Sequence, residues 1–321
     1  MLKETVLNVK DLKVSFSTDE GYLTAVDGVS FELNKGEVLG VVGESGCGKS
    51  VTSLSILRLL DRKKTKIDGD IQFNGQNLLE LKERNLRKIR GNSISMVHQN
   101  PMSSLNPVYT IGNQLSETIR LHQKVSKSES MQKSIELLRL VGIPSPEEKI
   151  HSYPHQLSGG MKQRVMIALA LACQPKILIA DEPTTALDVT IQSQILELMH
   201  KLKEEMDMSV IFITHDLGVV AEFCTKVVVM YLGQVVESAD VKSIFKSPLH
   251  PYTKGLLKSI PRIDGERNRQ LFSIEGAVPS LQEIPKGCRF SNRCTYVTQK
   301  CLDKAPELKE RSEGHYARCW L

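Results

Sequence analysis

The sequence feature that most limits the possible folds is a glycine-rich loop between an apolar strand and a helix. Residues 38–42 read VLGVV, and the next residues, GESGCGKS (43–50), fit the pattern G-x-x-x-x-G-K-[ST]. Glycines let consecutive backbone N–H groups face one anion, and the following helix adds the positive end of its dipole. In such a loop Lys49 bridges the β- and γ-phosphates of a nucleotide, and the Ser50 hydroxyl binds Mg²⁺. The candidate nucleotide-binding residues are Gly43, Ser45, Gly46, Cys47, Gly48, Lys49, Ser50 and Val51.

Two acids directly follow an apolar strand expected over 176–180. They are Asp181 and Glu182, in the run ILIADE. Ligands of parallel α/β sheets bind beyond the carboxyl ends of the strands, so both acids are expected to face the phosphate-binding loop. Asp181 is placed to hold Mg²⁺, and Glu182 to polarise an attacking water as general base. The alternative is a pair of acids that only caps the next helix.

Two further polar side chains stand at the ends of apolar runs. His215 follows SVIFIT (209–214), where its imidazole is placed to contact the γ-phosphate and to orient Glu182. Gln99 follows SISMVH (93–98), where its amide is placed to sense Mg²⁺ and the attacking water. Either residue alone is usually an ordinary polar strand end. For His215, its equivalent position in the same sheet favours the catalytic role.

A second glycine-rich element opens an apolar helix at residues 157–164, LSGGMKQR. Ser158 is a natural N-cap, and Gly159 and Gly160 expose amides to an approaching anion. A plain capped helix explains Ser158 but not two consecutive glycines, which weaken a helix start.

Apolar strands alternate with amphipathic helices along the chain, which predicts an α/β layered core. A helical stretch over about 99–170 separates the early strands from the late ones and predicts a separate lobe. Strands are expected over 5–16, 28–34, 176–180, 209–214 and 226–233, with a hairpin-like pair over 69–76 and a helix over 191–205.

Together these motifs resemble an ABC-type ATPase cassette, in order and spacing, over residues 5–245. The resemblance is carried by the phosphate-binding (Walker A) loop, Gln99, LSGGMKQR, ILIADEP (177–183), the turn Ala186-Leu187-Asp188 and His215. It implies a RecA-like core, an antiparallel β subdomain and an inserted helical subdomain. The expected segments are 1–98 (β subdomain and first part of the core), 99–165 (helical subdomain), 166–250 (second part of the core) and 251–321 (C-terminal extension).

The same resemblance implies that two cassettes sandwich two ATP molecules head to tail. Ser158, Gly159 and Gly160 would then contact the γ-phosphate held by the opposite subunit, and Asp188 would carry communication between the two sites. ATP would hold the dimer together, and hydrolysis would reopen it. The family stacks adenine on an aromatic residue before the first core strand; Tyr22 is the expected residue and Phe16 its rival.

Composition narrows the class of protein further. The 321 residues are 40% hydrophobic and 25% charged with a net charge of +5, which excludes a disordered or fibrous chain. The basic residues are scattered, so the charge alone does not indicate nucleic-acid binding. No apolar run approaches the roughly 20 residues of a membrane span, and the first residues, MLKETVLNVKDLKV, lack the apolar h-region that a signal peptide needs. These features predict a cytoplasmic protein.

Four of the seven cysteines crowd into the end of the chain: Cys288, Cys294, Cys301 and Cys319. In a reducing compartment such a group indicates metal before disulfides. Their spacing lacks the C-x-x-C pairs of ordinary zinc modules, but four thiolates suit either a cubane iron–sulfur cluster or tetrahedral zinc. Free thiols are the third alternative. Arg289, Arg293 and Arg318 either offset cluster charge or are solvated surface.

The segment around these cysteines, HPYTKGLLKSIP (250–261) and GAVPSLQEIPKGCRFSNRC (276–294), resembles the C-terminal extension of ATPase subunits in dipeptide and oligopeptide importers. Some members of that family carry a [4Fe-4S] cluster, which makes the cluster the favoured expectation and Zn²⁺ the alternative. The resemblance implies a second identical or homologous ATPase subunit, two transmembrane permease subunits and, indirectly, an extracytoplasmic peptide-binding protein. It places the chain at the cytoplasmic face of the membrane, with the coupling helices of the permease docking near residues 100–108.

The function expected from the sequence is therefore ATP hydrolysis that powers peptide import. One alternative is an ABC-type ATPase that acts on DNA or ribosomes, but the chain has a single Walker A loop and no long coiled coil. Another is a catalytically silent nucleotide-binding regulator, against which the intact Glu182 and His215 argue.

Overall fold

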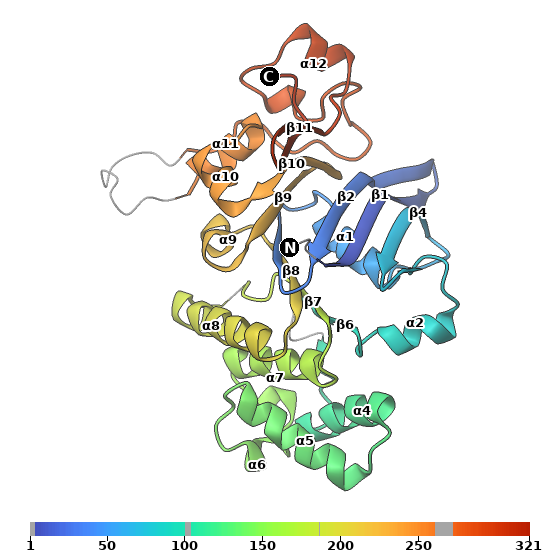
Figure 1. The fold of residues 1–321 in the computed structure, drawn as a ribbon, viewed down its shortest axis with the longest axis vertical. Helices are drawn as coiled ribbons and strands as arrows, with labels where there is room; N and C mark the ends of the chain where they lie inside the picture. Colours follow the sequence, from blue (N-terminus) through green and yellow to red (C-terminus); the bar gives the residue numbers. More distant parts are fainter. Residues whose placement is uncertain (1–3, 100–103, 186, 261–271) are drawn as a thin grey trace. The chain divides into compact units, whose positions relative to one another are not determined.

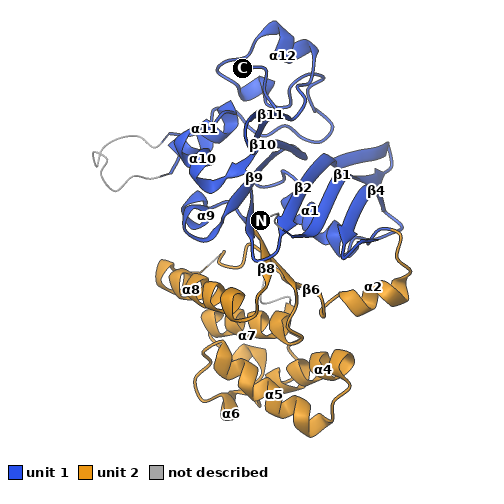
Figure 2. Cartoon of the chain, viewed as in Figure 1, with its two compact units in different colours: residues 1–79, 213–321 blue, residues 80–212 orange. Residues whose placement is uncertain are grey.

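The computed structural model describes residues 4–99, 104–185, 187–260 and 272–321 (Figure 1). The chain forms two compact units: unit 1 comprises Met1–Leu79 and Ile213–Leu321, and unit 2 comprises Glu80–Phe212 (Figure 2). The four segments expected from the sequence do not correspond to these two units, and that division stays a prediction. Among the described residues, no helix is both long and apolar enough to cross a bilayer.

The N-terminal part of unit 1 is a four-stranded antiparallel sheet in the order β2-β1-β4-β5. Its strands are β1 (Thr5–Thr18), β2 (Gly21–Asn34), β4 (Thr65–Phe73) and β5 (Gln76–Asn77). Alternate side chains of β1, such as Leu7 and Val9, are buried, as the period of a half-buried strand requires. The expectation that the second strand begins at 28 was wrong. The hairpin turns within two residues after Thr18, and its polar tip lacks apolar alternation because it is exposed.

A second sheet in unit 1 contains the strand that precedes the phosphate-binding loop. The strand β3 (Val38–Val42) pairs in parallel with β9 (Lys226–Tyr231), and β10 (Gln234–Asp240) returns antiparallel to β9. The sequence predicted one strand over 226–233, but Leu232 and Gly233 both adopt positive φ and form a tight turn. The C-terminal hairpin of β11 (Lys309–Ser312) and β12 (His315–Ala317) extends this sheet beside β10. The tail, expected to be mostly loops, therefore adds two strands to the sheet.

Short helices complete unit 1. They are α1 (Lys49–Ile56), α9 (Leu217–Phe223), α10 (Val241–Lys246), α11 (Pro251–Lys258), α12 (Gln299–Asp303) and the 3₁₀ turn η2 (Ser291–Arg293). Asp216 and Asp240 cap α9 and α10 by accepting backbone N–H bonds, which satisfies donors that each helix start leaves open.

Unit 2 holds two parallel strands and most of the long helices. The strand β6 (Ile94–Val97) pairs with β7 (Ile177–Asp181), and both are almost wholly buried. β8 (Ser209–Thr214) crosses the boundary into unit 1. The helices are α2 (Glu83–Ile89), α4 (Ile111–Gln123), α5 (Lys127–Leu140), α6 (Pro146–Lys149), the 3₁₀ turn η1 (Pro154–Gln156), α7 (Gly159–Leu171) and α8 (Val189–Glu205). The predicted helical stretch is thus present, and α4, α5 and α7 pack on one another.

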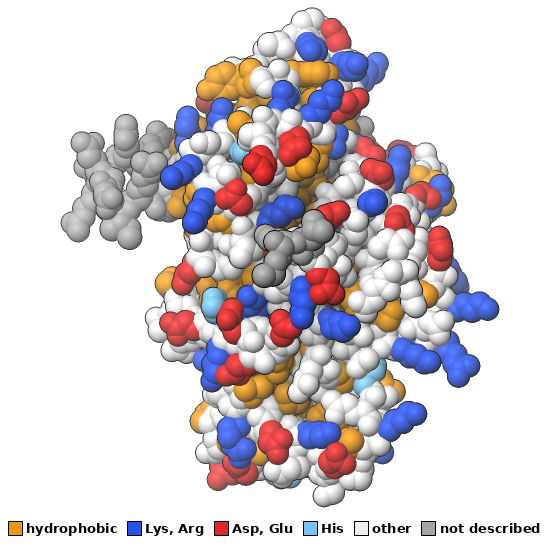
Figure 3. Space-filling view, viewed as in Figure 1, with side chains coloured by type: hydrophobic (Ala, Val, Ile, Leu, Met, Phe, Trp, Pro, Cys, Tyr) orange, Lys and Arg blue, Asp and Glu red, His pale blue; other side chains and the backbone are white. Residues whose placement is uncertain are grey.

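The charged side chains of the surface are of both signs. Figure 3 shows Lys and Arg interspersed with Asp and Glu over the face in view, in agreement with the small net charge of +5.

Candidate functional site

The glycine-rich loop connects β3 to α1, as its sequence predicts. Gly43 and Gly48 have φ of 154° and 100°. A Cβ on Gly43 would lie 2.3 Å from the Met230 carbonyl oxygen, and one on Gly48 would lie 2.9 Å from that of Ala25. Only glycine satisfies both the backbone angles and these close approaches.

The loop presents its middle to solvent and buries its ends. Ser45 and Gly46 are exposed, whereas Cys47 is buried and Lys49 is only 6% exposed. Burial raises the pKa of the Cys47 thiol. The Lys49 ammonium donates to the carbonyl oxygens of Gly43, at 2.7 Å, and Glu44, at 3.0 Å. Ser50 and Val51 lie in the first turn of α1.

In unit 2 the structure brings together the side chains of Gln99 and Glu182, two of the predicted catalytic residues. Asp181 ends β7 and is 5% exposed. Glu182 follows it with φ of 47°, a strained value for a residue with a side chain. Its Oε2 accepts hydrogen bonds from Gln99 Nε2 at 2.8 Å and from Thr185 Oγ1 at 2.9 Å. Strained backbone and converging donors are typical of functional positions.

His215 directly follows β8 and is exposed. It belongs with the phosphate-binding loop to unit 1, whereas Asp181, Glu182 and Gln99 belong to unit 2. The predicted catalytic set is thus divided between the two units.

The LSGGMKQR element begins α7 with an exposed tip. Ser158 is the N-cap, and its Oγ accepts from Met161 N at 3.3 Å. A Cβ on Gly160 would lie 3.1 Å from Ile191 of α8, so packing within the unit accounts for this glycine. A Cβ on Gly159 would meet nothing within 4 Å. Gly159 therefore remains the glycine that packing does not explain.

Asp188 caps α8 by accepting from Ile191 N at 2.9 Å. This contact gives Asp188 a structural role beside the predicted role in communication. Of the predicted turn, Ala186 lies outside the described residues.

The two adenine-stacking candidates differ in exposure. Tyr22, near the start of β2, is 64% exposed, whereas Phe16 of β1 is half-buried between its strand neighbours. Stacking requires an accessible ring face, which favours Tyr22.

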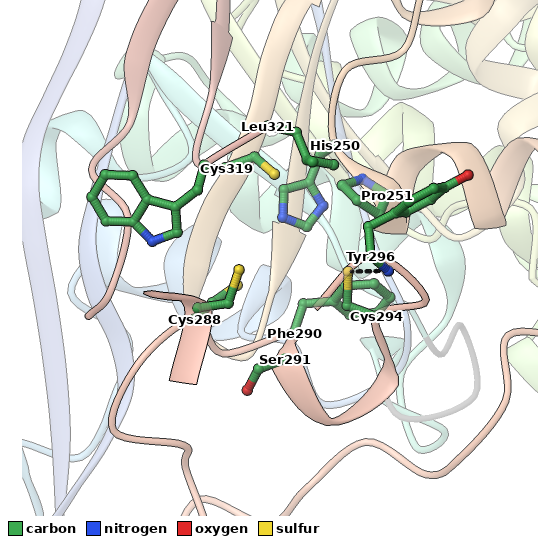
Figure 4. A pocket seen from close by; sticks show the side chains of 11 residues that line it. His250, Pro251, Cys288, Phe290, Ser291, Cys294, Tyr296, Cys319 and Leu321 are labelled. Carbon is green, nitrogen blue, oxygen red and sulfur yellow. Dashed lines mark hydrogen bonds between the residues drawn. The ribbon is translucent and has the colours of Figure 1, made fainter. Parts of the chain in front are cut away.

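The four clustered cysteines line one cavity at the end of the chain, as Figure 4 shows for Cys288, Cys294 and Cys319. Burial raises the pKa of Cys288 to about 11, and the three other thiols add to this shift by charge repulsion. The Sγ of Cys294 accepts from Tyr296 N at 3.4 Å. Among the described residues, no three His, Cys, Asp or Glu side chains lie close enough together to hold a single metal ion.

Gly287 allows the two ends of this cysteine segment to meet. Cys288 N donates to Cys301 O at 2.7 Å. A Cβ on Gly287 would lie 2.2 Å from that same oxygen and 2.5 Å from Leu302 O. No side chain fits there without moving the backbone.

We therefore expect Gly287→Ala to destabilise the C-terminal segment by about 2–4 kcal/mol. Limited proteolysis of residues 272–321 measures the effect. The control is Gly314→Ala, where the new Cβ meets nothing within 4 Å and only the positive φ of 67° costs ~1 kcal/mol. Equal resistance of Gly287→Ala and wild type to the protease would contradict the expectation.

The arginines beside the cysteines are anchors, which argues against the alternative that they are solvated surface. Arg289 pairs with Asp27 and donates to Leu232 O. Arg318 Nε donates to Val235 O at 2.8 Å. The Arg293 side chain is buried and forms an ion pair with Glu44. All three fasten the cysteine segment to the rest of unit 1.

A buried carboxylate, unnoticed in the sequence, fixes the same region. Glu237 is fully buried in β10 and accepts from Leu249 N at 2.7 Å and His250 N at 2.9 Å. His315 Nε2 lies 2.7 Å from Glu237 Oε1. No local sequence signal marks this acid, because its partners come from distant segments.

His250 makes the stability of unit 1 sensitive to acid. Burial, aided by the charges of Lys254 and Arg318, lowers the pKa of His250 to about 3, and its Nδ1 accepts from Tyr252 N at 3.1 Å. Below pH 6.5 the His250 imidazole is protonated in the unfolded chain but stays neutral in the folded chain. The free energy of unfolding therefore falls as the pH drops toward 3.

His250→Asn, which keeps a capping acceptor, should lose less stability on acidification than wild type, by up to ~1.4 kcal/mol per pH unit. Thermal unfolding at pH 7 and pH 5 measures the difference between the two proteins. Identical shifts would show that His250 is not the responsible group.

Comparison with known proteins identifies the class first. Solved ABC cassettes share the fold. The dimeric ATP-binding cassette MJ0796 bound to ADP and Pi aligns with a TM-score of 0.66 at 28% identity, covering 73% of this chain and 98% of that one. The cassette cbiO1 of Clostridium perfringens aligns with a TM-score of 0.63 at 28% identity, covering 76% and 92%. The ABC transporter family matches residues 26–185. The expected cassette fold is confirmed, and the protein is an ABC-type ATPase.

A match in the C-terminal region identifies the family more narrowly. The region called "Oligopeptide/dipeptide transporter, C-terminal region" matches residues 236–301. The oligopeptide transport ATP-binding protein AppD of Bacillus subtilis is 52% identical, covering 99% of this chain and 97% of AppD. The dipeptide transport ATP-binding protein DppD of the same organism is 51% identical, covering 99% and 95%. The chain belongs to the family of ATP-binding subunits of peptide ABC transporters.

Proposed function

We propose that this chain hydrolyses ATP to ADP and phosphate to power an importer of dipeptides or oligopeptides. The observation that carries the proposal is likeness over almost the whole chain, C-terminal region included, to transport ATP-binding proteins. These relatives do not favour an ATPase that acts on DNA or ribosomes.

The nucleotide site is proposed to form on the loop from Gly43 to Ser50. Its N–H groups and Lys49 bind the phosphates, and exposed Tyr22 stacks on adenine. Ser50, Asp181 and Gln99 would hold Mg²⁺, which supplies charge stabilisation during phosphoryl transfer.

Glu182 is proposed as the general base that takes a proton from the attacking water. Hydrogen bonds from Gln99 and Thr185 to its Oε2 orient the Glu182 carboxylate, and His215 is proposed to orient the water and the γ-phosphate.

A second copy or homologue is proposed to complete each site. Ser158 and Gly159 are exposed at the tip of α7, and Gly160 follows them in the same turn. These residues would bind the γ-phosphate on the opposite subunit through helix N-terminal amides. Asp188 is proposed to carry communication between the sites. MJ0796 is solved as a dimer, which supports this arrangement.

The permease is proposed to dock beside the Gln99 loop, at the cytoplasmic face of the membrane. A cavity in unit 2 lies there, lined by Val97, His98, Ser104, Met166 and Leu169 among others. Residues 100–103 of the expected dock lie outside the described residues. The remaining partners proposed are two transmembrane subunits and an extracytoplasmic peptide-binding protein.

The four cysteines are proposed to hold a [4Fe-4S] cluster, with Zn²⁺ as the alternative. Four half-buried thiols around one cavity, with N–H···S contact at Cys294, suit thiolate ligation. The four ligand sulfurs of a single zinc ion all lie ~2.3 Å from that ion and are therefore close together. The four ligand sulfurs of an iron–sulfur cluster lie farther apart. When bound, such a group cross-links the segment and neutralises thiolate charge. We assign it a structural or sensory role.

Peptide uptake in cells tests the proposed function. Deleting the gene should abolish uptake of radiolabelled di- and oligopeptides but not of free amino acids. Wild type should restore uptake, and Lys49→Ala should not. Undiminished peptide uptake after deletion would refute peptide import, and ATPase activity stimulated by DNA or ribosomes would favour the alternative.

A further inference from the structure

A bidentate ion pair joins the cysteine segment to the phosphate-binding loop. Arg293 Nη1 lies 2.6 Å from Glu44 Oε2, and Nη2 lies 3.1 Å from Oε1. The Arg293 side chain is 4% exposed and that of Glu44 is 30% exposed. Paired bonds between a guanidinium and a carboxylate fix orientation as well as distance. Glu44 is the second residue of the loop, directly after Gly43.

Arg293 is itself held in place by its own segment. Its Nε donates to Glu275 O at 3.0 Å and its Nη2 to Ile274 O at 3.3 Å. Arg293 is the last residue of η2 and immediately precedes Cys294. A shift of the cysteine segment would therefore move the guanidinium, and with it the Glu44 side chain.

A second contact from the C-terminal region holds the backbone of the same residue. Glu44 N donates to the phenol oxygen of Tyr252 at 2.9 Å. Tyr252 lies in the first turn of α11 and is fully buried, with its ring 4.8 Å from that of Tyr231 and 5.4 Å from that of Phe290. The backbone and the side chain of Glu44 are thus both fastened.

The fastened residue also positions the loop lysine. Lys49 donates to the carbonyl oxygens of Gly43 and Glu44. Binding an anion in such a loop is favoured when its N–H groups and lysine are already in place, because less ordering is needed on binding. Loosening Glu44 would remove part of that preorganisation.

We propose that Arg293 and Tyr252 are positioning residues of the nucleotide site, through which the cysteine segment sets ATP affinity. The proposal rests on the assignment of Gly43–Ser50 as that site, and it holds whether or not the cysteines bind metal. Linkage makes the coupling reciprocal, so ATP stabilises the cysteine segment in turn.

Calorimetric titration of the full chain with Mg-ATP tests the proposal. We expect Arg293→Met to weaken ATP binding roughly tenfold. The KM for ATP should rise with kcat little changed, which a loss of stability alone would not produce. Tyr252→Phe keeps the ring packing and should weaken binding in the same direction. The matched control is Arg318→Met: Arg318 also immediately precedes a cysteine but contacts Val235 and Pro306 instead of the loop, so ATP affinity should change less than about twofold.

A charge reversal keeps the proposal falsifiable if the single variants are unstable. Glu44→Arg and Arg293→Glu should each weaken binding, and the double variant should recover most of the loss. Wild-type affinity in Arg293→Met and Tyr252→Phe, or no recovery in a folded double variant, would overturn the proposal. The Lys49→Ala variant distinguishes failure of the nucleotide-site assignment from failure of the positioning role. If this variant binds ATP as tightly as wild type does, the assignment of Gly43–Ser50 as the nucleotide site is wrong.

Discussion

Replacing Glu182 by Gln should slow ATP hydrolysis at least about a hundredfold while ATP binding is retained. The amide cannot accept the proton of the attacking water, so the step that needs a base is lost. The neutral side chain is nearly the same size and its oxygen can still accept a hydrogen bond from Gln99 or Thr185, so the local geometry should survive. ATP-dependent dimerisation should therefore persist and become longer-lived.

Phosphate release measures hydrolysis, and light scattering with Mg-ATP measures dimerisation. Glu205→Gln, on the exposed surface of α8, is the matched control and should leave both unchanged. Unchanged turnover in Glu182→Gln would refute the role of Glu182 as base. Loss of ATP-dependent dimers in both variants would instead point away from the proposed sandwich.

Replacing Cys294 by Ser should remove most of the iron from protein purified without oxygen, from about four atoms per chain in wild type. The hydroxyl is a poor substitute for a thiolate, and Cys294 shares its cavity with the three other cysteines. Loss of the visible absorbance of the cluster should accompany the loss of metal.

Metal analysis and absorbance distinguish the alternatives for this cavity. Cys173→Ser is the control, since Cys173 lies in unit 2 and outside the cavity, and it should keep the full iron content. A colourless, iron-free wild type would refute the cluster. Zinc in its place would support the alternative, and neither metal would indicate free thiols.

The parts of the molecule predicted correctly are those encoded in contiguous stretches. The phosphate-binding loop needs only a strand, glycines with special backbone angles and a helix start, all within residues 38–56. The strand that ends at Asp181 is another local pattern. The strand expected over 226–233 runs two residues past the end of β9, and β10 was not predicted, because its sequence QVVESAD is mostly polar.

Contacts between segments that are distant in the sequence could not be predicted from local sequence patterns. Arg293 and Glu44 are 249 residues apart, and Tyr252 and Glu44 are 208 apart. The motif from His250 to Tyr252 was visible in the sequence, but nothing nearby indicated that its phenol accepts a hydrogen bond from the loop.

The amino-acid sequence by itself determined the chemistry available to this protein: an anion cradle with its lysine, two acids at a strand end, a capped glycine tip and four cysteines. The loop, the acid pair and the glycine pair each lie in one short contiguous stretch, and the four cysteines lie within residues 288–319, so residue types and spacing are sufficient to recognise them. Only the tertiary structure decided that three arginines beside the cysteines bond to other parts of unit 1, and that one of them, Arg293, pairs with Glu44 of the loop. Pairings of this kind depend on which surfaces the packed strands and helices bring face to face, and composition does not specify that.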